Sequence, residues 1–140
     1  GMKFSMLRPL STYHDLYTQA DEVLESVGMG AKRDVVVKNL SYGEQRQIEI
    51  SLALISNPRV LLLDEPTAGL SRVDTQRVMH LIEALKKRYT IVLIEHKMDV
   101  VMRISDRITV MHFGEVLAEG TPEQIRSNPA VRLAYLGKRG

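Results

Sequence analysis

The chain has 140 residues, of which 44% are hydrophobic, and its formal net charge is only +2. This length and apolar content suit the core of one domain, and so small a charge gives no argument for binding nucleic acid. The absence of cysteine excludes disulfides and thiolate metal sites, and no apolar run approaches the roughly 18 residues that cross a bilayer. We therefore expect a soluble, intracellular protein.

The first predicted element is an amphipathic helix of about four turns that begins near Tyr13. Thr12 and Asp15 can form a capping box at its start, and Gly28 supplies a stop at its end. The β-branched run at residues 35–37 follows, and it could be a short strand or an apolar plug.

A second helix is predicted to begin after Ser41 and to end near Asn57, because Pro58 follows. Ser41 and Glu44 have the spacing of a capping box. A helix N-terminus that contains Gly43 offers unpaired N–H groups, a nearby hydroxyl and a partial positive charge, which together suit a phosphate. Ordinary helix capping is the alternative explanation of the same residues.

A buried strand is predicted at residues 60–63, where four apolar residues stand in a row. Asp64 and Glu65 emerge at its C-terminal end, and Pro66 stops it. Parallel sheets bind ligands at this end of their strands, and phosphoryl transfer uses a magnesium-bound carboxylate beside a water-orienting residue. Four apolar residues and two acids also arise by chance, so other motifs must support this interpretation.

A βαβ unit is predicted to follow this strand. Ser71 and Asp74 can cap a helix whose apolar positions line one face, namely Val78, Leu81, Ile82 and Leu85. The strand at residues 90–94 then returns parallel to the first. His96 lies just beyond this strand, so we expect it near Asp64 and Glu65.

The last third of the chain is predicted to be scaffold. Residues 97–104 suggest a short helix, and residues 107–112 and 115–119 suggest a β-hairpin that packs as an edge of the sheet. Pro122 and Pro129 stand at positions typical of the first residue of a helix.

Four motifs in register resemble those of ABC-type ATPases, over roughly residues 20–137. Residues 40–47 resemble the signature motif, and residues 60–66 resemble the Walker B strand. Residues 67–71 resemble the D-loop, and residues 94–96 resemble the end of the strand that carries the switch histidine. The order and spacing of the four motifs make the resemblance specific.

Finer details resemble the ATPase subunits of branched-chain amino-acid importers. They are Tyr42 in the third signature position, residues 68–70, the run at 94–101, and the ending from residues 120–123 to 135–137. Two departures from the family pattern are Glu44, where Gln is more frequent, and Ser71, where many members have Asp.

The resemblance implies an α/β fold, the C-terminal half of the mostly parallel sheet of a P-loop NTPase, with flanking helices and a C-terminal β-hairpin. Residues 2–57 would be part of the helical signature subdomain, and residues 58–140 the C-terminal part of the nucleotide-binding core. No G-x-x-x-x-G-K-[ST] loop occurs in the chain. We therefore expect a fragment that lacks Walker A and is inactive alone.

The resemblance also implies cofactors and roles, with ATP and Mg²⁺ as the bound species. Asp64 would hold Mg²⁺, Glu65 would polarise the attacking water, and His96 would contact the γ-phosphate. The residues expected to contact nucleotide are Ser41, Tyr42, Gly43, Glu44 and Asp64. The signature residues would act in trans, on the nucleotide of a second ATPase subunit.

The expected partners are a second ATPase subunit, as homodimer or heterodimer, and membrane permease subunits, with no nucleic acid. This places the protein peripherally on the cytoplasmic face of the inner (plasma) membrane. Exposed strand edges and helix faces of such a fragment would favour self-association.

Two alternatives come from other functional classes. The C-terminal lobe of a DNA-repair ABC-type ATPase should have a long heptad coiled coil before the signature, and only one short amphipathic helix precedes Leu40. A non-catalytic interaction module could supply a signature loop in trans to a complete partner. The presence of Asp64, Glu65 and His96 argues against that second alternative.

Overall fold

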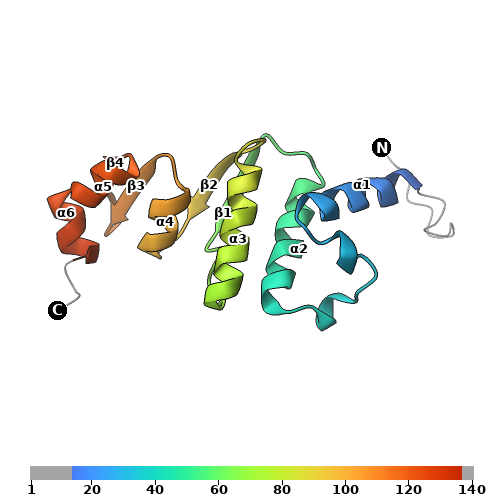
Figure 1. Ribbon diagram of the computed structural model, residues 1–140. Coiled ribbons are helices and arrows are strands. Elements are labelled where there is room, and N and C mark those ends of the chain that lie inside the picture. The colour runs from blue at the N-terminus through green and yellow to red at the C-terminus, as the bar shows by residue number, and fades with distance from the viewer. Residues whose placement is uncertain (1–13, 137–140) are drawn as a thin grey trace. The chain divides into compact units, whose positions relative to one another are not determined.

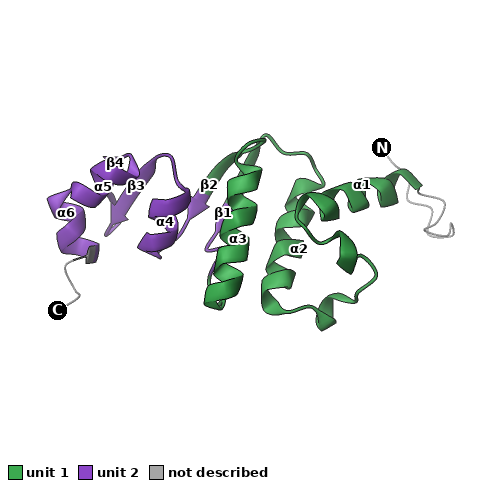
Figure 2. Cartoon of the chain, viewed as in Figure 1, with its two compact units in different colours: residues 1–62, 68–92 green, residues 63–67, 93–140 purple. Residues whose placement is uncertain are grey.

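The computed structural model describes residues 14–136 of the chain (Figure 1). They divide into two units (Figure 2). Unit 1 lies within residues 1–62 and 68–92, and unit 2 within residues 63–67 and 93–140. None of the helices within residues 14–136 has the length and apolar character needed to cross a membrane.

The helices of unit 1 are α1 (His14–Ser26), α2 (Tyr42–Leu54) and α3 (Arg72–Leu85). The first predicted helix is confirmed as α1, and Gly28 follows it with a φ of 72° that suits glycine. Thr12 and Tyr13 lie outside the described residues. Along α1, all of which is described, no residue is buried, whereas Val27 just beyond it is.

The segment between α1 and α2 is neither a strand nor an apolar plug. It forms two 3₁₀ turns, at Gly30–Lys32 and Val37–Asn39, and the exposed fractions of Val36 and Val37 are 60% and 52%. The backbone N–H of Val35 donates to the carbonyl of Lys32. Short-range turn bonds of this kind use the backbone N–H and C=O groups that a strand would need for pairing. The β-branched run therefore forms no strand, and it lies on the surface.

Helices α2 and α3 contact each other and supply much of the core of unit 1. The four apolar positions predicted to line one face of α3 are all buried. From α2, Ile50 and Leu54 are buried. The amphipathic pattern thus identified the packed face of α3 correctly.

Strands β1 (Val60–Asp64) and β2 (Thr90–Ile94) pair in a two-stranded sheet. Thr90 N–H donates to the carbonyl of Arg59, and Glu65 N–H donates to the carbonyl of Ile94. Both strands therefore run in the same direction, which confirms the predicted parallel pairing.

The prediction of β1 as a buried strand holds for only one face of the strand. Leu61 and Leu63 are buried, but Val60 and Leu62 on the other face are 49% and 73% exposed. Val92 in β2 is also 49% exposed. Side chains alternate between the faces of a strand, so helix packing on one face leaves the other apolar and bare.

We expect the chain to self-associate through this bare face of β1 and β2, because burial of exposed apolar surface is favourable. The substitution Leu62→Thr should shift sedimentation profiles towards monomer. Leu52→Gln on α2 removes another exposed leucine, 65% exposed, and should leave the profile unchanged. A monodisperse monomer of the unmodified chain at high concentration would contradict the prediction.

Unit 2 contains a short helix, a hairpin and a terminal helical segment. Its elements after β2 are α4 (Met98–Ile104), β3 (Ile108–His112), β4 (Glu115–Gly120), α5 (Pro122–Ser127), α6 (Pro129–Val131) and a π-helical turn (Arg132–Leu136). The hairpin and the terminal helices share one core, made by Ile108, Val110, Ile125 and Val131.

The predicted hairpin is confirmed, but its predicted place as an edge of the parallel sheet is not. Strands β3 and β4 pair antiparallel, from Ile108 opposite Gly120 to His112 opposite Glu115. Within residues 14–136 they form a separate two-stranded sheet. The buried side chains of Ile108 and Val110 in β3 share a core with α5 and α6, so the hairpin builds this core without joining β1 and β2.

Candidate active site

Two carboxylates stand at the C-terminal end of β1, as the sequence predicts. Asp64 ends the strand and Glu65 comes next, with a φ of 44°. A positive φ is strained for a residue with a side chain, costing roughly 1–3 kcal/mol, and such strain concentrates at functional sites. The backbone therefore turns sharply at the residue predicted to polarise water.

The structure brings His96 and Glu65 together. The Nδ1 atom of His96 lies 3.1 Å from Oε1 of Glu65, within hydrogen-bonding distance. Both side chains are accessible, with exposed fractions of 63% and 48%. A carboxylate paired with an imidazole can accept a proton and position a second donor, which suits hydrolytic chemistry.

A third acidic residue, Glu95, was not singled out from the sequence. Its side chain is fully buried, with 0% exposed. The hydroxyl of Thr67 donates to its Oε1, and the backbone N–H groups of His96 and Lys97 donate to its Oε2 at 3.0 and 3.2 Å. Its position is the sequence signal that could have identified it. Glu95 is an acidic residue directly after a strand, as Glu65 is.

Burial raises the pKa of Glu95, but the opposing influences are stronger in sum. They are the hydrogen bonds from Thr67 and from the backbone of Lys97 and His96, together with the charge of Lys97. The pKa therefore lies below its ordinary value, and Glu95 is ionised at neutral pH.

Asp64 is exposed at the C-terminal end of β1, where it could hold a cation. Within residues 14–136, no group of three or more His, Asp or Glu side chains is arranged to enclose a metal ion. Mg²⁺ usually keeps several waters and takes one or two carboxylates together with substrate phosphates. A single aspartate therefore fits Mg²⁺ delivered with a nucleotide.

The predicted capping box at the start of α2 is confirmed. The N–H of Glu44 donates to Oγ of Ser41 at 3.3 Å, and the N–H of Ser41 donates to Oε2 of Glu44 at 2.8 Å. Lys32, which the sequence did not indicate, lies 3.2 Å from Oε1 of Glu44. The hydrogen bond from Ser41 and the contact with Lys32 lower the pKa of Glu44, so its charge is already balanced within the chain.

The first residues of α2 lie against the segment that precedes and starts α3, all within unit 1. A Cβ atom at Gly43 would lie 2.6 Å from Cγ of Asp74, and one at Gly69 would lie 3.3 Å from the ring of Tyr42. The predicted cap of α3 is also confirmed, because the N–H of Asp74 donates to Oγ of Ser71. The sequence identified Asp74 only as part of that cap.

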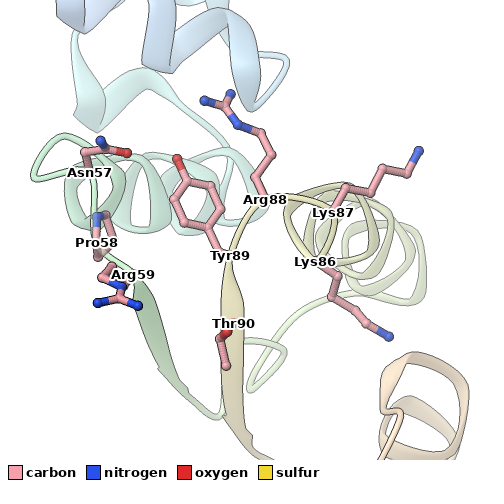
Figure 3. A pocket seen from close by; sticks show the side chains of 8 residues that line it. All are labelled: Asn57, Pro58, Arg59, Lys86, Lys87, Arg88, Tyr89 and Thr90. Carbon is pink, nitrogen blue, oxygen red and sulfur yellow. The ribbon is translucent and has the colours of Figure 1, made fainter.

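A hollow of about 510 Å³ lies near the N-terminal ends of β1 and β2, lined by residues 57–59 and 86–90 (Figure 3). Basic side chains are frequent in its lining, but they point in different directions and do not meet at one point (Figure 3). The basic run 86–88 directly follows the C-terminus of α3, whose carbonyls favour positive charge. The hollow is therefore not the predicted active site, because Asp64 and Glu65 follow the other end of β1.

Models of two known families match the chain. Residues 5–68 match the ABC transporter family, and residues 115–140 match the family described as branched-chain amino acid ATP-binding cassette transporter. The chain belongs to the ATP-binding-cassette family. The resemblance inferred from the four motifs is thus confirmed, including its branched-chain amino-acid subfamily.

Curated relatives agree with the family models. The chain is 48% identical over 117 residues to the high-affinity branched-chain amino acid transport ATP-binding protein LivG of Escherichia coli K12, covering 82% of this chain and 46% of LivG. It is 46% identical to the corresponding protein BraF of Pseudomonas aeruginosa, with the same coverage of 82% and 46%. The chain thus spans about half the length of the curated relatives it matches.

The fold agrees with a solved member of the family. The ADP conformation of MJ1267, an ATP-binding cassette of an ABC transporter, superposes with a TM-score of 0.79 at 28% sequence identity. The match covers 97% of this chain and 54% of MJ1267. The predicted fold class, a partial ABC ATPase fold of the P-loop NTPase type, is therefore confirmed.

Proposed function

We propose that the chain is part of an ATP-binding and ATP-hydrolysing subunit that powers branched-chain amino-acid import. The observation that carries this proposal is the pairing of Glu65 and His96 at the C-terminal ends of two parallel strands, beside Asp64. The transport activities in the names of LivG and BraF support the assignment of solute class.

In the proposed reaction, Glu65 accepts a proton from the attacking water as the water oxygen bonds to the γ-phosphorus. The bond from that phosphorus to the β–γ bridging oxygen breaks, and ADP leaves. His96 has its Nδ1 beside Glu65, so its Nε2 is the ring nitrogen left to contact a γ-phosphate oxygen. Mg²⁺ held by Asp64 would neutralise charge on the phosphates.

The signature residues Ser41, Tyr42, Gly43 and Glu44 lie in unit 1, where they open α2. We assign them to the nucleotide of a second ATPase subunit, so that they act in trans. The bonding of Glu44 supports this role, because its carboxylate accepts a hydrogen bond from Ser41 and is paired with the positive charge of Lys32. A negative charge left free at this point would repel a polyphosphate.

The same proposal assigns a domain organisation and partners to the subunit of which this chain is part. Residues 2–57 would belong to its helical signature subdomain and residues 58–140 to its nucleotide-binding core. The subunit would bind a second ATPase subunit and membrane permease subunits, peripherally on the cytoplasmic face of the membrane.

A chimera tests the function directly. The matching half of E. coli LivG would be replaced by this chain and expressed in cells that lack LivG. We expect restored uptake of branched-chain amino acids and ATP hydrolysis by the purified chimera. Glu65→Gln and His96→Ala should each abolish both, with losses of roughly 10²-fold or more.

Controls separate failed assembly from wrong function. Leu52→Gln, an exposed position on α2, should leave uptake and hydrolysis unchanged. A chimera that binds the permease subunits and hydrolyses ATP equally well with Glu65→Gln would contradict the assigned role of Glu65. ATP hydrolysis without uptake of any branched-chain amino acid would contradict the solute class.

A further inference from the structure

We propose that Glu95 is a positioning residue, a buried carboxylate that connects the segment after β1 to the segment after β2 and thereby holds His96 beside Glu65. Only the consequence of this positioning for hydrolysis rests on the proposed function.

The carboxylate of Glu95 is bonded to both segments. A buried charge is strongly unfavourable unless it is paired and hydrogen-bonded. The side chain of Glu95 is fully buried, and its two carboxylate oxygens both accept hydrogen bonds. Oε1 takes the hydroxyl of Thr67, which follows β1, and Oε2 takes the N–H groups of His96 and Lys97, which follow β2. The carboxylate is therefore satisfied only while both segments keep these positions.

A second link connects the same two segments. The ammonium group of Lys97 donates to the backbone carbonyl of Thr67 at 2.6 Å. Thr67 is fully buried. Its hydroxyl bonds to Glu95 and its carbonyl bonds to Lys97, and both of these residues follow β2. Lys97 also places a positive charge near Glu95, which helps to keep the carboxylate ionised.

The consequence concerns the exposed pair that the mechanism uses. Glu65 stands two residues before Thr67, and His96 directly follows Glu95. Both side chains of the 3.1 Å contact are accessible, so the contact between them would be weak by itself. The buried bonds of Glu95 restrict the backbone on both sides of the contact and thus supply the order that the exposed pair lacks.

The tautomer of His96 reports this positioning without any nucleotide. A neutral imidazole held against Glu65 donates from Nδ1, so the unmodified chain should show the Nδ1–H form in ¹⁵N spectra of labelled histidine. Thr67→Val keeps the size of the side chain but removes the hydroxyl, and it should move His96 towards the Nε2–H form. Thr67→Ser keeps the hydroxyl and should preserve the Nδ1–H form.

Internal controls separate positioning from general loss of structure. His80 in α3 and His112 in β3 should keep their signals in both variants. Hydrogen exchange gives a measurement that needs no variant, because the amides of His96 and Lys97 should be protected in the unmodified chain. We expect their exchange to become roughly tenfold or more faster in Thr67→Val.

Several outcomes would overturn the proposal. Unprotected amides at His96 and Lys97 in the unmodified chain would do so, as would an unchanged tautomer in Thr67→Val. In the LivG chimera, Thr67→Val should lower kcat with KM unchanged, and Thr67→Ser should restore it. A tautomer shift with full kcat would overturn the role in hydrolysis, whereas a chimera that is inactive in every form contradicts only the proposed function.

Discussion

The 140-residue chain by itself is expected to hydrolyse Mg²⁺-ATP no faster than buffer. Asp64, Glu65 and His96 are present, but the chain carries no Gly-rich loop with Lys and Ser or Thr to hold the phosphates. Correct placement of the reactants lowers the activation barrier of a catalysed reaction by about 7–11 kcal/mol. Without that placement, a correctly formed Glu65–His96 pair has no fixed substrate on which to act.

Phosphate release from purified chain measures this expectation, and calorimetric titration of Mg²⁺-ATP accompanies it with Asp64→Asn as the matched variant. We expect neither turnover nor binding heat from the chain or its variant. ATP turnover that persists through purification and disappears in Glu65→Gln would contradict this prediction. Binding lost in Asp64→Asn would show that copies of the chain build a phosphate site of their own.

Gly43→Ala is expected to lower the free energy of unfolding by about 1–3 kcal/mol, the usual cost of overpacking. The added Cβ would lie 2.6 Å from Cγ and Oδ1 of Asp74 and 2.8 Å from its Cβ. The carboxylate cannot simply turn away, because Ser71 donates to its Oδ2 at 2.7 Å and Arg77 to its Oδ1 at 3.2 Å. The start of α2 or of α3 must therefore shift.

Urea unfolding of a double-mutant cycle tests the origin of this cost. Asp74→Ala removes the carboxylate, so Gly43→Ala should cost clearly less in that background than in the unmodified chain. Equal costs in both backgrounds would mean that the contact with Asp74 is not the cause. In the LivG chimera, the shifted start of α2 should also reduce hydrolysis, because it displaces the signature residues assigned to a second subunit.

Much of the fold follows from short-range signals. The capping box at Ser41 and the cap at Ser71 each depend on residues three positions apart, and both form as their spacing predicts. The hairpin turn likewise depends on two adjacent residues, Phe113 and Gly114, which take φ values of 49° and 83°.

The predictions of strand and of burial are wrong where the result depends on which other segments pack against the one in question. The valine run at residues 35–37 has the composition of a strand but lies on the surface, where Val37 begins a 3₁₀ turn. Leu62 stands within four apolar residues of β1 and yet is 73% exposed. Composition measures how well a segment tolerates burial, and only its neighbours decide whether burial occurs.

Residue patterns along the chain predicted the family, the caps at Ser41 and Ser71, the parallel pairing of β1 and β2, and the nearness of His96 to Glu65. These follow from patterns of residues near one another in the chain, where backbone geometry sets which groups can meet. The tertiary structure decided that Glu95 is buried between Thr67 and Lys97, that Lys32 balances Glu44, and that Asp74 fills the space beside Gly43. Such contacts join segments that are distant in the sequence, and they exist only once the chain has folded.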